Sequence, residues 1–236
     1  MKHPRAEAFE QEFTGKEISN YKIGTFIDVG QQGAVFQATK IYLEPLEKAI
    51  VYACKIIDKS TIDDEITQIR LDLEIEIMTD YIDHNIVRCF YKHDDGKFIY
   101  LIMDFCNEGD LGKHVRDKKD SRLPEAEAIG WLQQIANGFV KLHEEKIIHR
   151  DIKFDNLLIM GGVLKLADFG ISKKGDLACS GVGTPLTKAP EILKCDPWVG
   201  GTNDSNLVYN SKCDLFSVGV VYYWMLFGEH PYVNGM

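Results

Sequence analysis

The sequence predicts an α+β fold with two lobes: a small antiparallel β lobe that carries one helix, and a larger, mainly α-helical lobe. Three observations support this: strand-like runs between residues 21 and 57, helical periodicity from residue 61, and mostly helical patterning after residue 110. The chain has 236 residues, of which 45% are hydrophobic and 27% charged. This balance is typical of a globular protein and is enough for one large domain or two small lobes.

The first lobe is predicted from its β-type segments. YKIGTFIDVG, GAVFQATKIYL and AIVYACKII are rich in Val, Ile, Tyr and Phe, with Gly, Pro or charged residues between them. From residue 61 apolar residues recur every three or four positions, which marks one helix face: Ile62, Ile66, Ile69, Leu73 and Ile77. Two further strands, IVRCFYKHD and KFIYLIMDF, meet at the hairpin signal DDGK. We therefore expect a five-stranded sheet with one helix.

The second lobe is predicted to be helical apart from one short hairpin, LLIMGGVLKL, in which the two glycines supply the turn. Residues 126–144 place most of their apolar side chains on one helix face: Ile129, Leu132, Ile135, Ala136, Phe139, Val140 and Leu142. A change of composition near residues 106–110 indicates the lobe boundary. We expect a flexible or loosely packed lead-in at 1–19 and one domain at 20–236, divided into lobes at 20–104 and 105–236.

Charge and hydropathy argue against two classes of partner. A net charge of -9 disfavours nucleic acid, which is bound largely by clustered Lys and Arg. The most apolar run, VGVVYYWMLF, has half of the roughly 20 residues that span a bilayer, so we expect a buried helix and no membrane span. The six cysteines form no CxxC pair and the N-terminus has no apolar signal core. These features favour reduced thiols and a cytoplasmic location.

Several short motifs follow one another in a fixed order. HRDIKFDN occupies residues 149–156, DFG begins at Asp168 and APE at Ala189, while a strand ending VYACK and a loop reading DVGQQGAV precede them. Each motif alone is weak evidence, but their order and spacing make coincidence improbable. With these motifs the chain resembles the eukaryotic protein kinase family, Ser/Thr type, from about Tyr21 to the C-terminus.

The resemblance implies a bilobal protein-kinase-like fold that transfers the γ phosphate of ATP to Ser or Thr hydroxyls of protein substrates. That chemistry needs accurate positioning and neutralisation of phosphate charge. Asp168 and Asn156 offer the hard oxygens that Mg²⁺ prefers and are the expected metal ligands. By similarity, Asp151 orients the acceptor hydroxyl and takes its proton. Lys153 resembles the lysine that steadies the γ phosphate in Ser/Thr kinases, whereas tyrosine kinases usually carry other residues there.

A lysine and a helix carboxylate are expected to bind the other phosphates. By similarity, Lys55 reaches the α and β phosphates of ATP. Its partner is Glu74 or Glu76, which point to different faces of the helix because they are two residues apart. The resemblance of EIEIMTDYIDHNIV to the family's EIEI…HPNIV pattern selects Glu74. For Lys55 or Glu74 taken alone, a solvated surface charge would be the default interpretation.

The remaining nucleotide contacts are also implied by the resemblance. The family's phosphate loop reads GxGxxGxV, and this chain has Asp28 in place of the first glycine. Core packing accounts equally well for the three apolar residues expected around adenine. The expected ATP-binding residues are Val29, Gly30 and Gly33 in the loop, Val35, Ala53 and Leu158 around adenine, and Met103, Asp104, Phe105 and Cys106 at the hinge.

After the DFG motif we expect an activating phosphosite and two differences from the usual family sequence. Ser180 lies where the family carries its activation-loop phosphate, which an upstream activating kinase would supply, and Arg150 and Lys173 are placed to receive it. Thr187 and Lys188 replace the Tyr and Met of the family's GTPxYMAPE. Neither change removes a catalytic group, but Thr187 could disturb the floor of the substrate site.

Two other functions compete with catalysis. The first is a pseudokinase that serves as an interaction scaffold. It is favoured by Asp28, by Thr187 and by a sequence that ends at GEHPYVNGM, before the last helices of the family. By similarity we therefore expect a C-terminally truncated, marginal domain. The full set of catalytic side chains opposes the scaffold function. A small-molecule phosphotransferase is disfavoured because the sequence motifs Gly-Thr-Pro (GTP) and Ala-Pro-Glu (APE) together belong to protein kinases. DFCNEGDL and IIHRDIK resemble the calcium/calmodulin-type and autophagy-initiating kinase groups.

Overall fold

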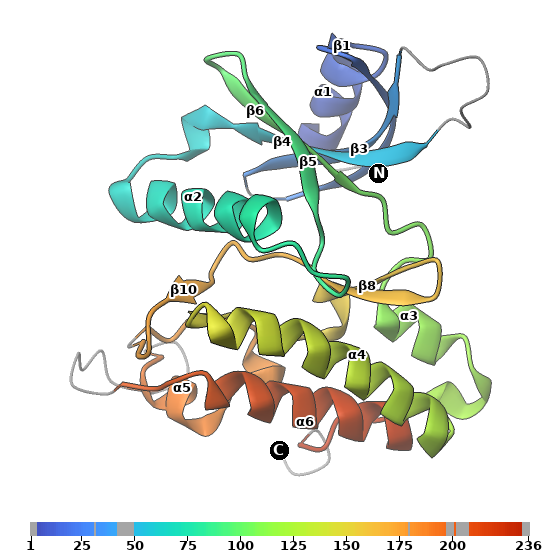
Figure 1. Ribbon diagram of the computed structural model, residues 1–236, viewed down its shortest axis with the longest axis vertical. Coiled ribbons are helices and arrows are strands. Elements are labelled where there is room, and N and C mark those ends of the chain that lie inside the picture. Colours follow the sequence, from blue (N-terminus) through green and yellow to red (C-terminus); the bar gives the residue numbers. More distant parts are fainter. Residues whose placement is uncertain are drawn as a thin grey trace. The chain divides into compact units, whose positions relative to one another are not determined.

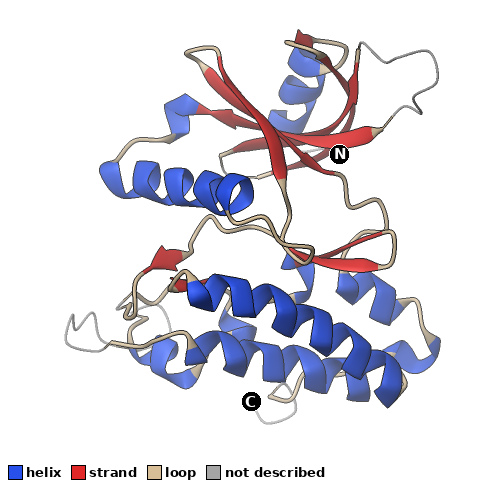
Figure 2. Cartoon of the chain, in the orientation of Figure 1, coloured by secondary structure: helices blue, strands red, loops and turns tan. Residues whose placement is uncertain are grey.

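A computed structural model describes residues 4–30, 32–41, 50–178, 180–196, 201 and 208–232. It divides into two compact units: unit 1 comprises Met1–Gln68 and Arg88–Phe105, and unit 2 comprises Ile69–Val87 and Cys106–Met236. Unit 1 is built mainly from strands and unit 2 mainly from helices (Figures 1 and 2). The α+β fold of the family is therefore confirmed, while the linear boundaries at residues 20 and 105 stay predictions.

The described residues of unit 1 form one antiparallel sheet with the strand order β1-β2-β3-β4-β6-β5. The sheet has six strands instead of the expected five because a two-residue strand before the first expected one pairs with the start of β2. The turn between β5 and β6 uses Gly96 at φ 92°, which glycine adopts without strain. The strands are β1 (Glu17–Ile18), β2 (Tyr21–Val29), β3 (Gly33–Lys40), β4 (Val51–Asp58), β5 (Cys89–Asp94) and β6 (Phe98–Asp104).

The expected flexible lead-in is wrong, because its residues form helix α1 (Pro4–Phe13). Phe9 and Phe13 lie one helical turn apart and therefore share a face. Both are buried in one cluster, in which the Phe13 ring lies 4.9 Å from that of Phe98 and 6.2 Å from those of Phe36 and Tyr100. This aromatic cluster fixes α1 against one face of the sheet.

Helix α2 (Glu65–Asp80) follows the short turn η1 (Lys59–Thr61) and confirms the expected helix. Its expected apolar face is only partly correct, since Ile66 and Ile69 are exposed whereas Leu73 and Ile77 are buried. Apolar residues occupy nearly every second position of this helix, so their spacing alone does not select one face. The further buried apolar residues are Leu71, Ile75 and Met78.

The described residues of unit 2 form four further α-helices and two small antiparallel sheets, β7 with β10 and β8 with β9. The expected β8–β9 hairpin is confirmed, with Gly161 and Gly162 both at positive φ. In the described part of the chain no helix is long and apolar enough to cross a membrane. The elements are α3 (Leu111–Arg116), η2 (Lys119–Ser121), α4 (Glu125–Glu144), β7 (Ile147–Ile148), η3 (Phe154–Asn156), β8 (Leu157–Met160), β9 (Val163–Leu166), β10 (Lys173–Lys174), η4 (Pro185–Thr187), α5 (Pro190–Lys194) and α6 (Lys212–Phe227).

The buried face of α4 differs from the expected one. Ile129 and Val140 are exposed, and a neighbouring stripe packs inward instead: Ala128, Trp131, Ile135, Gly138 and Leu142. A Cβ at Gly138 would lie 2.6 Å from Leu166 Cδ1, so the helix approaches β9 most closely at this glycine. Close approach at a small residue thus selects between two overlapping apolar stripes.

Candidate active site

The loop that follows β7 is held by a buried carboxylate on α6. Asp214 accepts hydrogen bonds from the main-chain N–H groups of His149 and Arg150, both at 2.8 Å. Arg150 has φ 69°, a region that residues other than glycine rarely adopt. The two hydrogen bonds compensate this conformation and fix the residues just before Asp151.

The carboxylate of Asp151 is buried and receives four hydrogen bonds or ionic contacts. Oδ1 accepts from the main-chain N–H and the hydroxyl of Thr184, at 2.9 and 2.7 Å. Oδ2 accepts from Asn156 Nδ2 at 3.0 Å and lies 2.9 Å from Lys153 Nζ. Burial raises the pKa of Asp151, but the bonds from Thr184 and Lys153 outweigh it and leave this pKa below its ordinary value. Asp151 is therefore ionised at neutral pH and available as a base.

Lys153 and Thr184 are themselves in contact. Lys153 Nζ donates to Thr184 Oγ1 at 3.2 Å, while that hydroxyl donates to Asp151. The three side chains form a closed ring of polar contacts that joins the loop at 151–153 to the segment that carries Thr184. A hydroxyl beside Asp151 is thus bound by both the carboxylate and the ammonium group.

Asn156 and Asp168 are brought together by the main chain. Asn156 Nδ2 donates to both the main-chain O and the Oδ2 of Asp151. The side-chain oxygen of Asn156, Oδ1, takes no part in these two bonds. Ala167 N donates to Asn156 O at 3.0 Å and so places the DFG motif beside it. Asp168 has φ 60° and is exposed, whereas Phe169 is fully buried with its ring 5.0 Å from that of His149.

This pair of oxygen-bearing side chains fits Mg²⁺. The described residues contain no group of three or more His, Cys, Asp or Glu side chains arranged to hold a metal. Mg²⁺ is commonly bound through one or two protein oxygens, with waters and substrate phosphates as its other ligands. Asn156 and Asp168 therefore have the chemistry expected of such a site, although their role as ligands stays a prediction.

In unit 1, four expected nucleotide-binding residues lie on one face of the sheet. Val35 is the cross-strand partner of Lys55, and Ala53 is the partner of Met103. Directly opposed residues, and residues two apart on one strand, share a face. The alternate residues of these strands contribute to the aromatic cluster with α1 on the other face. The sheet thus separates a packed face from one that carries a cationic side chain among apolar residues.

The expected phosphate loop is a tight turn between β2 and β3. Gly30 N donates to Gly33 O at 2.8 Å. A Cβ at Gly33 would lie 1.8 Å from Ile56 O, so only glycine fits there. Asp28 is exposed, and its Oδ1 accepts from the N–H of Val29 at 2.8 Å. A Cβ at Gly30 would meet nothing within 4 Å, so the main chain is open at this glycine.

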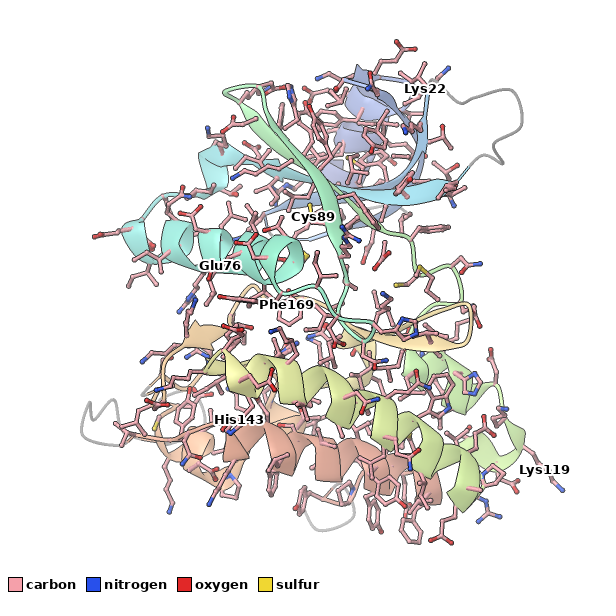
Figure 3. All side chains as sticks on the ribbon, viewed as in Figure 1. Lys22, Glu76, Cys89, Lys119, His143 and Phe169 are labelled. Carbon is pink, nitrogen blue, oxygen red and sulfur yellow. The ribbon has the colours of Figure 1, made fainter. Side chains whose placement is uncertain are left out.

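The helix carboxylates differ in their partners. Glu76 lies on α2 (Figure 3). Its side chain forms an ion pair with Lys174 at 2.6 Å and accepts a hydrogen bond from Tyr81, and both partners belong to unit 2. Glu74 is buried. This contrast supports the choice of Glu74 over Glu76. Because Lys55 lies in unit 1 and Glu74 in unit 2, their pairing stays a prediction.

The expected hinge residues end one unit and begin the other. Met103, Asp104 and Phe105 belong to unit 1, where Asp104 Oδ2 and N both bond to the main chain of Arg88. Cys106 begins the second segment of unit 2, and Leu158 is half-buried on β8. Their contacts with a nucleotide stay predictions.

Sequence reasoning gave no role to two residues that contact the expected site. Thr184 belongs to the Gly-Thr-Pro motif, which serves in the sequence only as a marker of the family, and its bond to Asp151 spans 33 positions in sequence. Arg5 Nη1 donates to Gly30 O at 3.3 Å and so connects α1 to the glycine turn. A threonine inside a known motif could have been singled out, but nothing in the sequence marks Arg5.

The chain is similar to known protein kinases. The protein kinase domain family matches residues 21–236. The serine/threonine-protein kinase atg1 of Dictyostelium discoideum is 35% identical over 93% of this chain, and the serine/threonine-protein kinase ATG1a of Arabidopsis thaliana is 31% identical over 91%. The Aurora kinase of Patiria pectinifera is 32% identical over 91%. The matches span 32%, 32% and 50% of these relatives' own lengths, so the chain corresponds to one part of each.

Proposed function

Because the chain belongs to the protein kinase family, in its serine/threonine branch, we propose that it transfers the γ phosphate of ATP to Ser or Thr hydroxyls of protein substrates. The observation that carries the proposal is the ionised carboxylate of Asp151, with Lys153 and the Thr184 hydroxyl beside it. A base, a cation and a bound hydroxyl within one ring of contacts are what an acceptor hydroxyl needs.

The reaction follows from the roles of these groups. The acceptor oxygen attacks the γ phosphorus, the bond from that phosphorus to the β–γ bridging oxygen breaks, and ADP leaves with the bond's electron pair. Asp151 orients the acceptor hydroxyl and accepts its proton. Lys153 stabilises negative charge on the phosphoryl group. In this proposal the hydroxyl and the main-chain N–H of Thr184 hold the Asp151 carboxylate in position for the acceptor hydroxyl.

The remaining site residues bind the nucleotide and its metal. Asn156 and Asp168 would hold Mg²⁺, which neutralises phosphate charge when it is bound. Lys55, held by Glu74, binds the α and β phosphates. The turn that carries Val29, Gly30 and Gly33 would lie over the phosphates. Adenine is bound by Val35, Ala53 and Leu158, and by the hinge residues Met103, Asp104, Phe105 and Cys106.

The test is transfer of labelled phosphate from ATP to a generic basic protein in the presence of Mg²⁺. Lys55→Met, Asp151→Asn and Asp168→Asn should each abolish transfer while the far-ultraviolet circular dichroism spectrum is retained. Asp155→Asn is the matched control, because Asp155 is exposed on η3, between the catalytic residues. Transfer that persists in the first three variants would contradict the assigned roles. A folded wild-type chain without any transfer would favour the scaffold function.

We also propose a cytoplasmic location and activation by an upstream kinase. The first is supported by the free thiols of Cys54, Cys89 and Cys213; Cys179 lies outside the described residues. The second is supported by the contact between Arg150 and Ser180. Fractionation of cells, and mass spectrometry of the activated chain, test the two proposals separately.

A further inference from the structure

Two opposite charges are buried together behind the segment that carries Thr184. Lys188 forms an ion pair with Asp196, and their side chains are only 5% and 4% exposed. Lys188 Nζ also donates to Gly181 O at 3.0 Å. A buried ammonium group is tolerated only with partners of this kind. The cation therefore has a fixed position, set by one carboxylate and one main-chain carbonyl.

The main chain folds tightly around this lysine. Gly183 has φ 105°, and a Cβ there would lie 2.3 Å from Arg150 O and 3.7 Å from Lys188 Cε. The N–H of Lys188 donates to Thr184 O at 3.1 Å. The Lys188 side chain thus crosses the turn that it closes, beside Gly183, and reaches back to residue 181.

Thr184 lies inside this turn and is the residue that contacts the proposed base. Both its main-chain N–H and its hydroxyl donate to Asp151 Oδ1. Two hydrogen bonds from Lys188 fix its position. Lys188 N donates to Thr184 O, and Lys188 Nζ donates to Gly181 O at the start of the turn. Movement of residues 181–188 would therefore displace two of the donors that hold the Asp151 carboxylate.

We propose that Lys188, through its ion pair with Asp196, is a positioning residue that holds Thr184 against the carboxylate of Asp151. The inference rests on the proposed function and deepens it, because it assigns a role to a residue that departs from the family's usual methionine. Methionine could fill the same volume, but it cannot donate to Gly181 O or pair with Asp196. This chain thus orders its acceptor-side turn with a buried charge pair.

The first test compares Lys188→Met with Lys194→Met, a control that removes an exposed lysine on α5. We expect kcat of Lys188→Met to fall about 10-fold or more, as is usual when a catalytic group is misplaced. The KM for ATP should change less than about twofold. A kcat equal to that of Lys194→Met would overturn the proposal.

A second variant separates positioning from folding. Lys188→Met leaves Asp196 buried without its cation, whereas Lys188→Met combined with Asp196→Leu replaces the pair by apolar groups, which is often neutral for stability. We expect the double variant to recover the wild-type melting temperature but not kcat. Recovery of kcat together with stability would show that the pair has only a structural role and would overturn the inference.

A readout that is independent of activity distinguishes this inference from the proposed function. Hydrogen–deuterium exchange at the Thr184 amide should be faster in both Lys188 variants than in wild type, because that N–H loses its fixed acceptor. Unchanged exchange would contradict the positioning role even if the chain transfers phosphate. If the Thr184 amide exchanges faster in the Lys188 variants but the wild-type chain transfers no phosphate, the positioning role is upheld and only the proposed function is contradicted.

Discussion

Arg150 Nη1 donates a hydrogen bond to Ser180 Oγ at 2.8 Å, across 30 positions in sequence. Tyr209 extends this contact, since its hydroxyl donates to Ser180 O at 2.5 Å and lies 3.4 Å from Arg150 Nη1. The main-chain N–H of the same arginine is held by Asp214, directly before Asp151. A change of charge at Ser180 would therefore act on the residue that precedes the proposed base.

The first prediction concerns Ser180 as a phosphosite. A phosphate there adds a charge of about -1.5 to -2 next to the Arg150 guanidinium and should strengthen the contact. We expect Ser180→Ala to lower the activity of a chain treated with an activating kinase, and Arg150→Ala to make that treatment ineffective. Thr25→Ala, an exposed position on β2, is the control. Equal activity of Ser180→Ala and wild type would mean that this segment is ordered without phosphate.

The second prediction concerns pH. The pKa of Asp151 lies below its ordinary value of 3.8, so the native state binds this proton less readily than the unfolded chain does. Its stabilising contribution is fully present above about pH 4 and is lost as pH falls through the folded pKa. Thr184→Val removes one donor, so the pKa should rise and the acid limb of activity should move to higher pH. Thr79→Val, which removes a hydroxyl bonded to Ile75 O on α2, should leave that limb unchanged.

The third prediction concerns Asp28. It is the cross-strand partner of Val35 and so shares the face of the sheet that carries Lys55. One negative charge about 4 Å from a phosphate costs about 1 kcal/mol in water and more in a cleft. Asp28→Asn should therefore tighten ATP binding about fivefold, measured by calorimetry. Asp63→Asn, an exposed site before α2, should not. Unchanged affinity in Asp28→Asn would show that this carboxylate points away from the phosphates.

The sequence allowed the fold class and the order of the elements to be predicted because both depend on local patterns. Strand composition, the DDGK and GlyGly turns and the helical periods all act within a few residues. The buried face of α4 could not be chosen in this way. It depends on close approach at Gly138 to Leu166, 28 positions away in sequence.

In the candidate site, too, local contacts could be predicted from the sequence and long-range contacts could not. Asp151, Lys153 and Asn156 share one short loop, so their motif was sufficient to place them together. Thr184 reaches Asp151 only after the chain has folded back, and a motif match says nothing of that contact. The Lys188–Asp196 pair is a further example, since in the sequence Lys188 is only a departure from the family's methionine and Asp196 lies in no motif.

The last prediction concerns α1, which precedes the part of the chain that the kinase family matches. Phe13 is fully buried, and Lys16 Nζ lies 5.0 Å from the centre of its ring. Truncation of a buried phenylalanine removes about 3 to 5 kcal/mol of unfolding free energy, through lost burial and the cavity that remains. We expect Phe13→Ala to show a loss of this size in urea denaturation followed by circular dichroism. Phe90→Ala is the matched control, because Phe90 lies on β5 of the same sheet and its side chain is exposed. Equal losses in the two variants would mean that α1 is not fixed to the sheet in solution and that the lead-in is loosely packed after all.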